Sequence, residues 1–168
     1  MQIRPVPEHA GPIEAAYAHA LAANEPVCVA QRWHADDRGW SLMNQLQRVL
    51  APEGQVNYSV QLPGVIKAWH RHAQQTDFWI VLHGHIKIGV HRTPDHALGE
   101  AAWSIVTGAH RPGVVIIPPT LWHGAATIGP EPAGLLYYVT RAFDPAKPDE
   151  ERRRFDDPAW FPWHVVHR

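Results

Sequence analysis

Apolar and polar residues follow one another in short runs along most of the chain after residue 26. Ten such runs are rich in β-branched or aromatic residues and are separated by glycine, proline or Asp-Arg-Gly turns. This pattern is typical of strands, and closely spaced strands without helices between them indicate a sandwich or small barrel. The expected strands lie within residues 27–33, 39–46, 55–62, 65–72, 77–84, 85–92, 101–106, 113–119, 124–128 and 134–143.

The two ends of the chain have other patterns. Residues 11–26 are rich in alanine, place Pro12 at the first turn and stop before Pro26, which predicts a helix. After Pro145 the chain is polar and broken by prolines, so we expect a tail that wraps the barrel with a short helical turn. Within it, the mixed charges of residues 150–154 predict a solvated face. The sequence thus predicts one all-β domain over 1–168, with a helical extension 1–25, a barrel 26–145 and a tail 146–168.

Composition limits the possible partners. The 168 residues are 45% hydrophobic and 18% charged with a net charge of −1, so no excess of positive charge favours nucleic acid. No apolar run approaches the roughly 20 residues of a membrane-spanning helix, and no signal-like stretch opens the chain. The single cysteine, Cys28, excludes an internal disulfide and fits a reducing compartment. We therefore expect a cytoplasmic protein without a nucleic-acid or membrane partner.

A group of histidines gives the strongest chemical signal. Strand alternation places His70 and His72 on one face, Asp77 begins the next expected strand, and His123 follows a later one. Three imidazoles and a carboxylate that converge inside a barrel are a ligand set suited to Fe, Mn, Ni or Zn. The same residues also suit a metal-free polar pocket in which one histidine is a base. The residues alone leave both possibilities open.

The stretch from residue 64 to residue 84 has the spacing G-x5-H-x-H-x4-D-x6-G. It resembles the first cupin motif, with Asp77 where that motif usually has Glu. The segment PPTLWHG resembles the second cupin motif, with Thr120 in place of its glycine. The resemblance implies a cupin fold, which is a double-stranded β-helix or jelly-roll-like barrel of two antiparallel sheets, and a homodimer.

A set of ordered segments is similar to the dTDP-4-dehydrorhamnose 3,5-epimerase family over roughly residues 33–160. This resemblance implies an epimerase or ketoisomerase that acts on a nucleoside-diphosphate 4-keto-6-deoxy sugar and requires no cofactor. The matching segments are DDRGW (36–40), QVNYS (55–59), GVIKAWH (64–70), IIPPTLWHG (116–124), LLYYVT (135–140) and FDP (143–145).

The family resemblance also implies roles for individual residues. His70 matches the base that removes a proton beside the 4-keto group, and Tyr137 matches the tyrosine that returns a proton from the other face. The chemistry is plausible because a base held beside a ketone, with an acid opposite, can exchange the α proton. The implied substrate-binding residues, the first three beside the nucleotide pyrophosphate, are Arg38, Gln55, Asn57, Lys67, His72 and His123.

Departures from the family pattern bear on the mechanism. At the position of Asp77 the epimerases have a lysine that stabilises the enolate, and at the position of His72 they have a glutamine. The epimerases also end with an acid that orients the base, and the resemblance matches no residue of this chain to that acid. Two histidines at this place also resemble the related 3,4-ketoisomerases, which work without metal. In this chain a divalent ion held by the histidines and Asp77 could replace the lysine as electrophile. Alternatively, Asp77 could orient His70 as a third catalytic residue.

Three classes of function therefore remain open. The first is the nucleotide-sugar epimerase or ketoisomerase. The second is a metal-dependent cupin oxygenase, isomerase or lyase that uses His70, His72, Asp77 and His123. The third is a non-catalytic cupin that binds a sugar.

Overall fold

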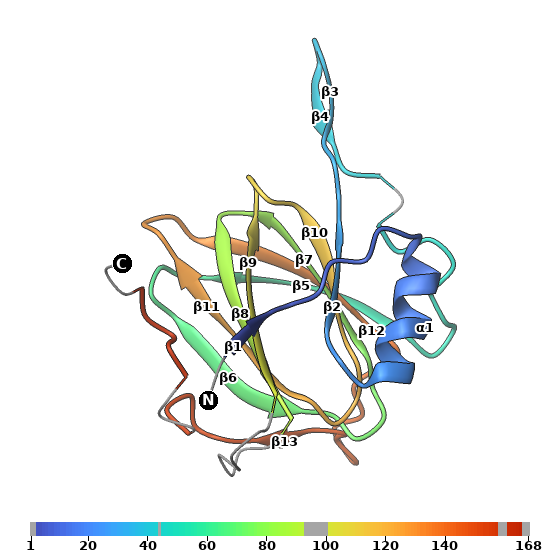
Figure 1. Ribbon diagram of the computed structural model, residues 1–168, viewed down its shortest axis with the longest axis vertical. Helices are drawn as coiled ribbons and strands as arrows, with labels where there is room; N and C mark the ends of the chain where they lie inside the picture. Colours follow the sequence, from blue (N-terminus) through green and yellow to red (C-terminus); the bar gives the residue numbers. More distant parts are fainter. Residues whose placement is uncertain (1–2, 44, 93–100, 158–160, 166–168) are drawn as a thin grey trace.

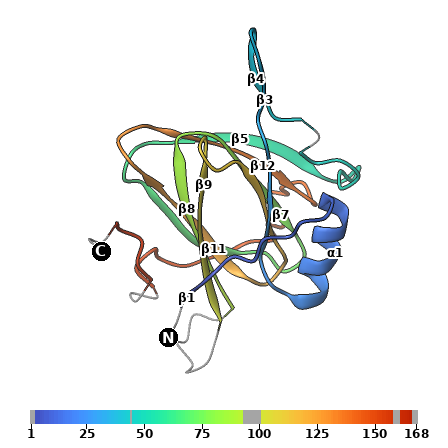
Figure 2. The ribbon, with the colours of Figure 1, turned by 45° about the horizontal axis from the view of Figure 1, so that its top comes forward.

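The computed structural model describes residues 3–43, 45–92, 101–157 and 161–165. Two sheets face each other to form a barrel, and helix α1 (Ile13–Ala23) packs on the outside of one sheet (Figures 1 and 2). Pro12 is the residue before the first helical turn, and Asn24 ends the helix in the left-handed conformation. The predicted all-β barrel with one N-terminal helix is confirmed.

All ten expected strands are present, with ends that differ by a few residues from those expected. The six-stranded sheet has the order β1 (Ile3–Pro5), β9 (Ala102–Gly108), β8 (His85–His91), β11 (Trp122–Ile128), β6 (Ile66–Arg71) and β13 (Glu151–Arg152). The five-stranded sheet has the order β2 (Val27–Ala30), β10 (Gly113–Ile117), β7 (Asp77–His83), β12 (Ala133–Val139) and β5 (Gln55–Gln61). β3 (His34–Asp36) and β4 (Gly39–Ser41) form a separate hairpin. The additional strands β1, β3 and β13 have only two or three residues each, too few for a visible alternation.

The core explains why β7 is a continuous apolar run. Trp79 and Val81 point between the sheets, whereas Phe78 and Ile80 point outward and pack with α1 and its neighbours. The strand is therefore buried on both faces. Gly84, with a φ of 66°, makes the tight turn from β7 into β8 that a residue with a side chain would strain.

The tail differs from the expectation after Pro145. Its described residues contain no helix and instead contribute β13, which lies along β6 with Arg152 opposite His70. Arg153 and Trp69 exchange two backbone hydrogen bonds of 2.9 Å. The free edge of β6 explains the difference, because its backbone groups need partners and an extended tail supplies them. Glu151 and Arg152 are thus an edge strand beside the barrel, and residues 151–154 are exposed, as expected of a solvated face.

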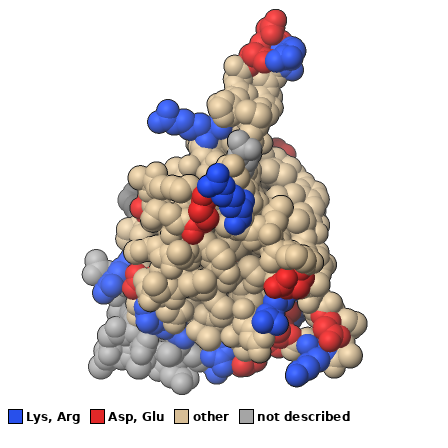
Figure 3. All heavy atoms as spheres, turned by 90° about the vertical axis from the view of Figure 1, so that its right-hand side faces the viewer, with Lys and Arg blue, Asp and Glu red and all other residues tan. Residues whose placement is uncertain are grey.

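The hairpin β3–β4 extends away from the barrel as an arm (Figures 1 and 3). Its tip carries charges of both signs (Figure 3), and the side chain of Trp40 is 74% exposed. Among the described residues, no helix has the length and apolar character needed to cross a membrane.

Candidate active site

The register of the strands brings the candidate residues together. In the six-stranded sheet His123 lies opposite His70, which in turn lies opposite Arg152. In the five-stranded sheet Tyr137 lies opposite Asn57. Directly opposed residues of paired strands point to the same face, so these two rows meet across the barrel interior. Between them is a cavity of about 740 Å³.

Most of the residues predicted from the sequence line this cavity. Seven of the nine do so: His70, His72, Asp77, Tyr137, Gln55, Asn57 and Lys67. His123 is 2% exposed and lies behind the cavity wall, in contact with the lining residues. Arg38 is elsewhere: its side chain is 85% exposed at the hairpin turn, where it pairs with Asp36. The structure therefore does not bring Arg38 to the cavity of its own chain.

Three histidines and Asp77 form a tight cluster at one end of the cavity. One nitrogen of each ring and one carboxylate oxygen lie within 4.8 Å of one another. The rings of His70 and His123 meet edge to face with centroids 4.1 Å apart, and His72 lies beside them. The predicted convergence of these four side chains is confirmed, whereas their roles as ligands or catalytic groups stay predictions.

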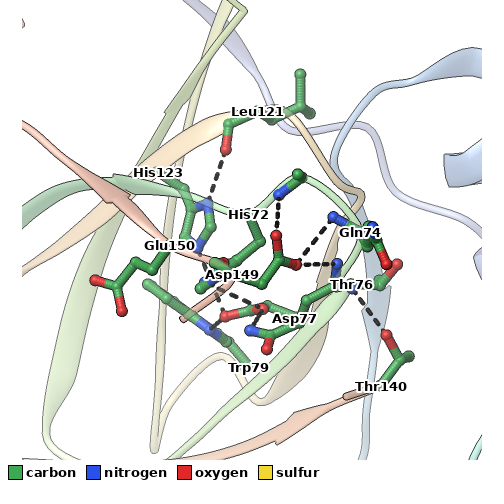
Figure 4. Close-up of polar contacts among 12 residues, drawn as sticks. His72, Gln74, Thr76, Asp77, Trp79, Leu121, His123, Thr140, Asp149 and Glu150 are labelled. Carbon is green, nitrogen blue, oxygen red and sulfur yellow. Dashed lines mark hydrogen bonds and ion pairs between the residues drawn. The ribbon is translucent and has the colours of Figure 1, made fainter. Parts of the chain in front are cut away.

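Backbone carbonyls determine how two of the rings face Asp77 (Figure 4). His123 Nδ1 is 2.9 Å from the carbonyl of Leu121, and His72 Nδ1 bonds to the carbonyl of Asp149. Because a carbonyl oxygen only accepts, both rings carry a proton on Nδ1. Their Nε2 atoms then face the Asp77 carboxylate at 3.5 Å for His123 and 3.9 Å for His72.

This cluster is rich in hydrogen-bond acceptors. In the neutral rings Nε2 carries a lone pair, and Nε2 of His123 is buried without a hydrogen-bond partner. A buried carboxylate beside such lone pairs needs a proton or a cation between them. Metal-binding histidines have this arrangement, in which the second ring nitrogen donates to a carbonyl. The cluster therefore fits a divalent cation, and it equally fits a protonated imidazole.

Asp77 is held at the centre of the cluster. Its oxygens accept hydrogen bonds from Gln75 Nε2 at 2.7 Å and from Trp79 Nε1 at 3.0 Å. Burial acts to raise the pKa of this carboxyl, but the neighbouring imidazole of His123, with smaller effects of the other two imidazoles, outweighs it and holds the pKa below 3.8. The ion-pair contacts of Asp77 go to His72 and His123, so the structure does not show the orientation of His70 by Asp77.

The pKa shifts of His70 and Tyr137 prepare one residue to accept a proton and the other to donate one. Burial lowers the pKa of His70 well below 6.5, and the nearby His123 and His72 lower it further against the opposing effect of Asp77. His70 is thus neutral at neutral pH and can accept a proton. Burial raises the pKa of Tyr137 above 10.0, and the negative charges of Asp77 and Glu150 add to it. Tyr137 thus keeps its proton and can donate it.

The tail supplies cavity residues outside the set of nine predicted from the sequence. Glu150, Arg152 and Arg153 line the cavity, and Glu150 pairs with Arg152. The guanidinium of Arg153 lies 5.0 Å from the ring centre of Trp122. Only the pairing of the tail with β6 places them there, and no spacing within residues 150–154 signals it.

The chain is similar in sequence to proteins of polysaccharide and glycan biosynthesis. Residues 34–151 match the family model described as the polysaccharide biosynthesis C-terminal domain. The chain is 31% identical over 139 residues to the spore coat polysaccharide biosynthesis protein SpsL of Bacillus subtilis (strain 168), which covers 80% of this chain and 92% of that protein. It is 41% identical over 102 residues to a probable low-salt glycan biosynthesis epimerase of Haloferax volcanii, covering 59% and 65% of the two chains.

Solved structures show the same fold. A dTDP sugar isomerase from Desulfovibrio desulfuricans G20 superposes with a TM-score of 0.70 at 22% identity, covering 82% of this chain and 90% of that chain. A 4-keto-6-deoxy sugar epimerase from Streptomyces spheroides superposes with a TM-score of 0.63 at 22% identity, covering 78% and 70%. At these identities the likeness establishes the cupin barrel and not the reaction.

Proposed function

This chain belongs to the polysaccharide biosynthesis C-terminal domain family, and on that premise we propose that it is an isomerase acting on a nucleoside-diphosphate sugar. The proposed reaction is epimerisation or ketoisomerisation beside the 4-keto group of a 6-deoxy sugar. The name of the Haloferax volcanii relative, a probable glycan biosynthesis epimerase, supports the class of reaction. The cupin barrel shared with sugar-nucleotide isomerases and epimerases is compatible with it.

One observation carries the proposal: His70 and Tyr137 line the same cavity from opposite sheets. Epimerisation removes a proton from one face of the sugar and returns a proton to the other. A neutral imidazole on one wall and a protonated phenol on the other meet that requirement. The cavity volume of about 740 Å³ lies within the range of small-molecule sites.

The remaining cavity walls suit the nucleotide end of such a substrate. Gln55 and Asn57 lie two residues apart on β5, and Gln55 Nε2 donates to Asn57 Oδ1 at 2.7 Å. Their remaining amide groups can bond phosphate and ribose oxygens. Lys67, which is exposed at the cavity, adds a positive charge for the diphosphate.

A second candidate adds a divalent cation to the same cavity. The orphaned Nε2 of His123 and the neighbouring carboxylate of Asp77 favour it. The ligands would be His70, His72, Asp77 and His123. A cation bound there supplies a Lewis acid that polarises the keto oxygen. The two candidates make different demands on His70, whose lone pair accepts a proton in the first and is shared with the cation in the second.

We also propose that the functional unit is a homodimer. On β5 the side chains of Val56, Tyr58 and Val60 point outward and are 55%, 51% and 49% exposed, while their polar neighbours face the cavity. An edge strand with an apolar outer face needs a partner, and the exposed Trp40 on the arm is a second apolar surface to cover. A second copy would cover both and could bring Arg38 to a cavity.

The dimer is tested by sedimentation or light scattering at micromolar concentration. The wild-type protein is expected to run at twice the chain mass, and Val60→Lys is expected to shift it toward the monomer because the charge would be buried at the interface. Lys67→Ala, which changes the opposite sheet, is the control and should stay dimeric. A wild-type monomer at these concentrations would contradict the proposal.

Tyr137→Phe tests the opposing acid. The variant is expected to retain exchange of the substrate proton with solvent, because His70 is intact, but to lose inversion by about 10²–10⁴-fold, because no acid faces the other side. Proton NMR in D₂O measures exchange and inversion together. The matched control is Tyr138→Phe, since Tyr138 points to the helix side and its hydroxyl accepts the N–H of Ala51. Equal rates of inversion in Tyr137→Phe and the wild type would remove Tyr137 from the mechanism.

A further inference from the structure

The loop that joins β6 to β7 begins at His72 and ends at Asp77, so it connects two members of the histidine cluster. Three successive backbone N–H groups of this loop, those of residues 73–75, donate to the carboxylate of Asp149 at 2.9, 3.0 and 3.1 Å (Figure 4). Hydrogen bonds to an ionised acceptor are about twice as strong as neutral ones. One side chain from the tail therefore holds the whole connection between the two cluster residues.

The same residue reaches both ends of the loop. The main-chain carbonyl of Asp149 accepts the Nδ1 proton of His72, which leaves Nε2 directed at the Asp77 carboxylate. At the other end, Gln75 is held through its backbone by Asp149 and donates its side-chain amide to Asp77 at 2.7 Å. The orientation of the His72 ring and the position of the Asp77 carboxylate both depend on contacts with Asp149.

Asp149 is itself held independently of the loop. Two residues after it, Glu151 accepts two hydrogen bonds from Arg71 at 3.0 and 2.9 Å, and β13 pairs with β6. Two backbone hydrogen bonds between Arg153 and Trp69 continue this attachment. The tail strand is thus fixed beside His70, and Asp149, two residues before it, contacts His72 and the loop.

We propose that Asp149 is a positioning residue of this site. Its carboxylate holds the loop between His72 and Asp77, so that the His72 ring meets the main-chain carbonyl of residue 149 and Gln75 reaches the Asp77 carboxylate. Asp149 is not among the residues that line the cavity of His70 and Tyr137. The inference deepens the proposed function and rests on it only for the kinetic part of its test.

The direct test is nitrogen-15 NMR of the histidine rings in the substrate-free, full-length chain. EDTA and a mildly alkaline buffer ensure that protein groups alone set the tautomers of neutral rings. The His72 signals are identified by their absence from the spectrum of His72→Gln. The wild type is expected to show a protonated Nδ1 and an unprotonated Nε2 for His72. Asp149→Ala keeps the main-chain carbonyl but releases the loop N–H groups, so His72 should no longer be held against that carbonyl and averaged signals from both tautomers are expected.

Two further variants make the result specific. Asp149→Asn keeps one acceptor oxygen for the loop, so its His72 spectrum is expected to be intermediate between those of the wild type and Asp149→Ala. It replaces Asp149→Ala in the test if that variant fails to fold. Glu151→Gln weakens the neighbouring ion pair with Arg71 without touching the loop and should leave the His72 signals unchanged. Unchanged His72 signals in both Asp149 variants would overturn the inference.

The kinetic readout separates positioning from general loss of structure. Asp149→Ala is expected to lower kcat for proton exchange by roughly 10–100-fold, the usual effect of removing a supporting contact. KM should change little, because Gln55 and Asn57 lie on the other sheet. A rise in KM with unchanged kcat would overturn the positioning role. If no sugar nucleotide is exchanged even by the wild type, the NMR comparison still decides the role of Asp149.

Discussion

Replacing His70 with asparagine is expected to reduce proton exchange between solvent and a 4-keto-6-deoxy sugar nucleotide to background. The loss should be roughly 10²–10⁴-fold, the usual contribution of a positioned general base. Asparagine keeps a similar size and polarity but cannot accept the proton. In the structure His70 is a neutral imidazole at the cavity wall, with a pKa lowered by burial and by His123, and it is the histidine of the described strand β6 that lines the cavity.

The measurement is proton NMR in D₂O, which follows the signal of the carbon-bound proton beside the keto group. The matched control is His83→Asn, because His83 is an exposed histidine at the end of β7 that contacts Tyr58 outside the cavity. His83→Asn should exchange protons at the wild-type rate. Exchange at the wild-type rate in His70→Asn would show that another group is the base.

Replacing Asp77 with asparagine is expected to have the second largest effect, on divalent-cation binding. The variant should bind cobalt(II) at least about 100-fold more weakly, because the change removes the only carboxylate of the four-residue cluster. Losing a ligand should weaken binding more than losing a residue that only supports a ligand. Visible absorption during a cobalt titration, together with elemental analysis of the protein as purified, measures this. Asp156→Asn is the control, because Asp156 is an exposed carboxylate that pairs with Arg154. Equal cobalt affinity in Asp77→Asn and the wild type would exclude the four-residue metal site.

The same variant tests the charge of Asp77 without metal. Its pKa in the folded protein is below the ordinary 3.8, so the ionised carboxylate stabilises the fold at neutral pH. This stabilisation is fully present above the unfolded pKa and is lost as the pH falls through the lowered folded pKa. In EDTA, the difference in unfolding free energy between the wild type and Asp77→Asn should therefore shrink on acidification below 3.8. A difference that stays constant would mean that the charge of Asp77 contributes nothing.

The barrel strands and the histidine cluster could be predicted because each has a local signature. Strands such as β7 and β8 carry long apolar or alternating runs, and His70, His72 and Asp77 lie within eight residues of one another. His123 is distant in sequence, and its convergence with them was predicted from the expected barrel; the register of β11 with β6 accounts for it. Local patterns that match the tertiary arrangement are the ones that sequence can reveal.

The contribution of the tail could not be predicted, because it depends on long-range pairing. Asp149 lies more than seventy residues from the loop that it holds, and nothing near it in sequence marks the contact. Arg152 reaches the cavity only because two residues of the tail add to the edge of β6. Arg38 shows the reverse case: the motif predicts a substrate contact, but the hairpin carries the side chain away from the barrel of its own chain.

The most direct test of the proposed function is solvent deuterium incorporation by the wild-type protein. A panel of nucleoside-diphosphate 4-keto-6-deoxy sugars, which differ in base and in sugar configuration, is incubated with the protein in D₂O and followed by proton NMR. The proposal predicts that at least one member loses the signal of a proton beside the keto group, at a rate proportional to protein concentration. Tight binding of these sugar nucleotides without any exchange would contradict it and identify the barrel as a non-catalytic sugar-binding cupin.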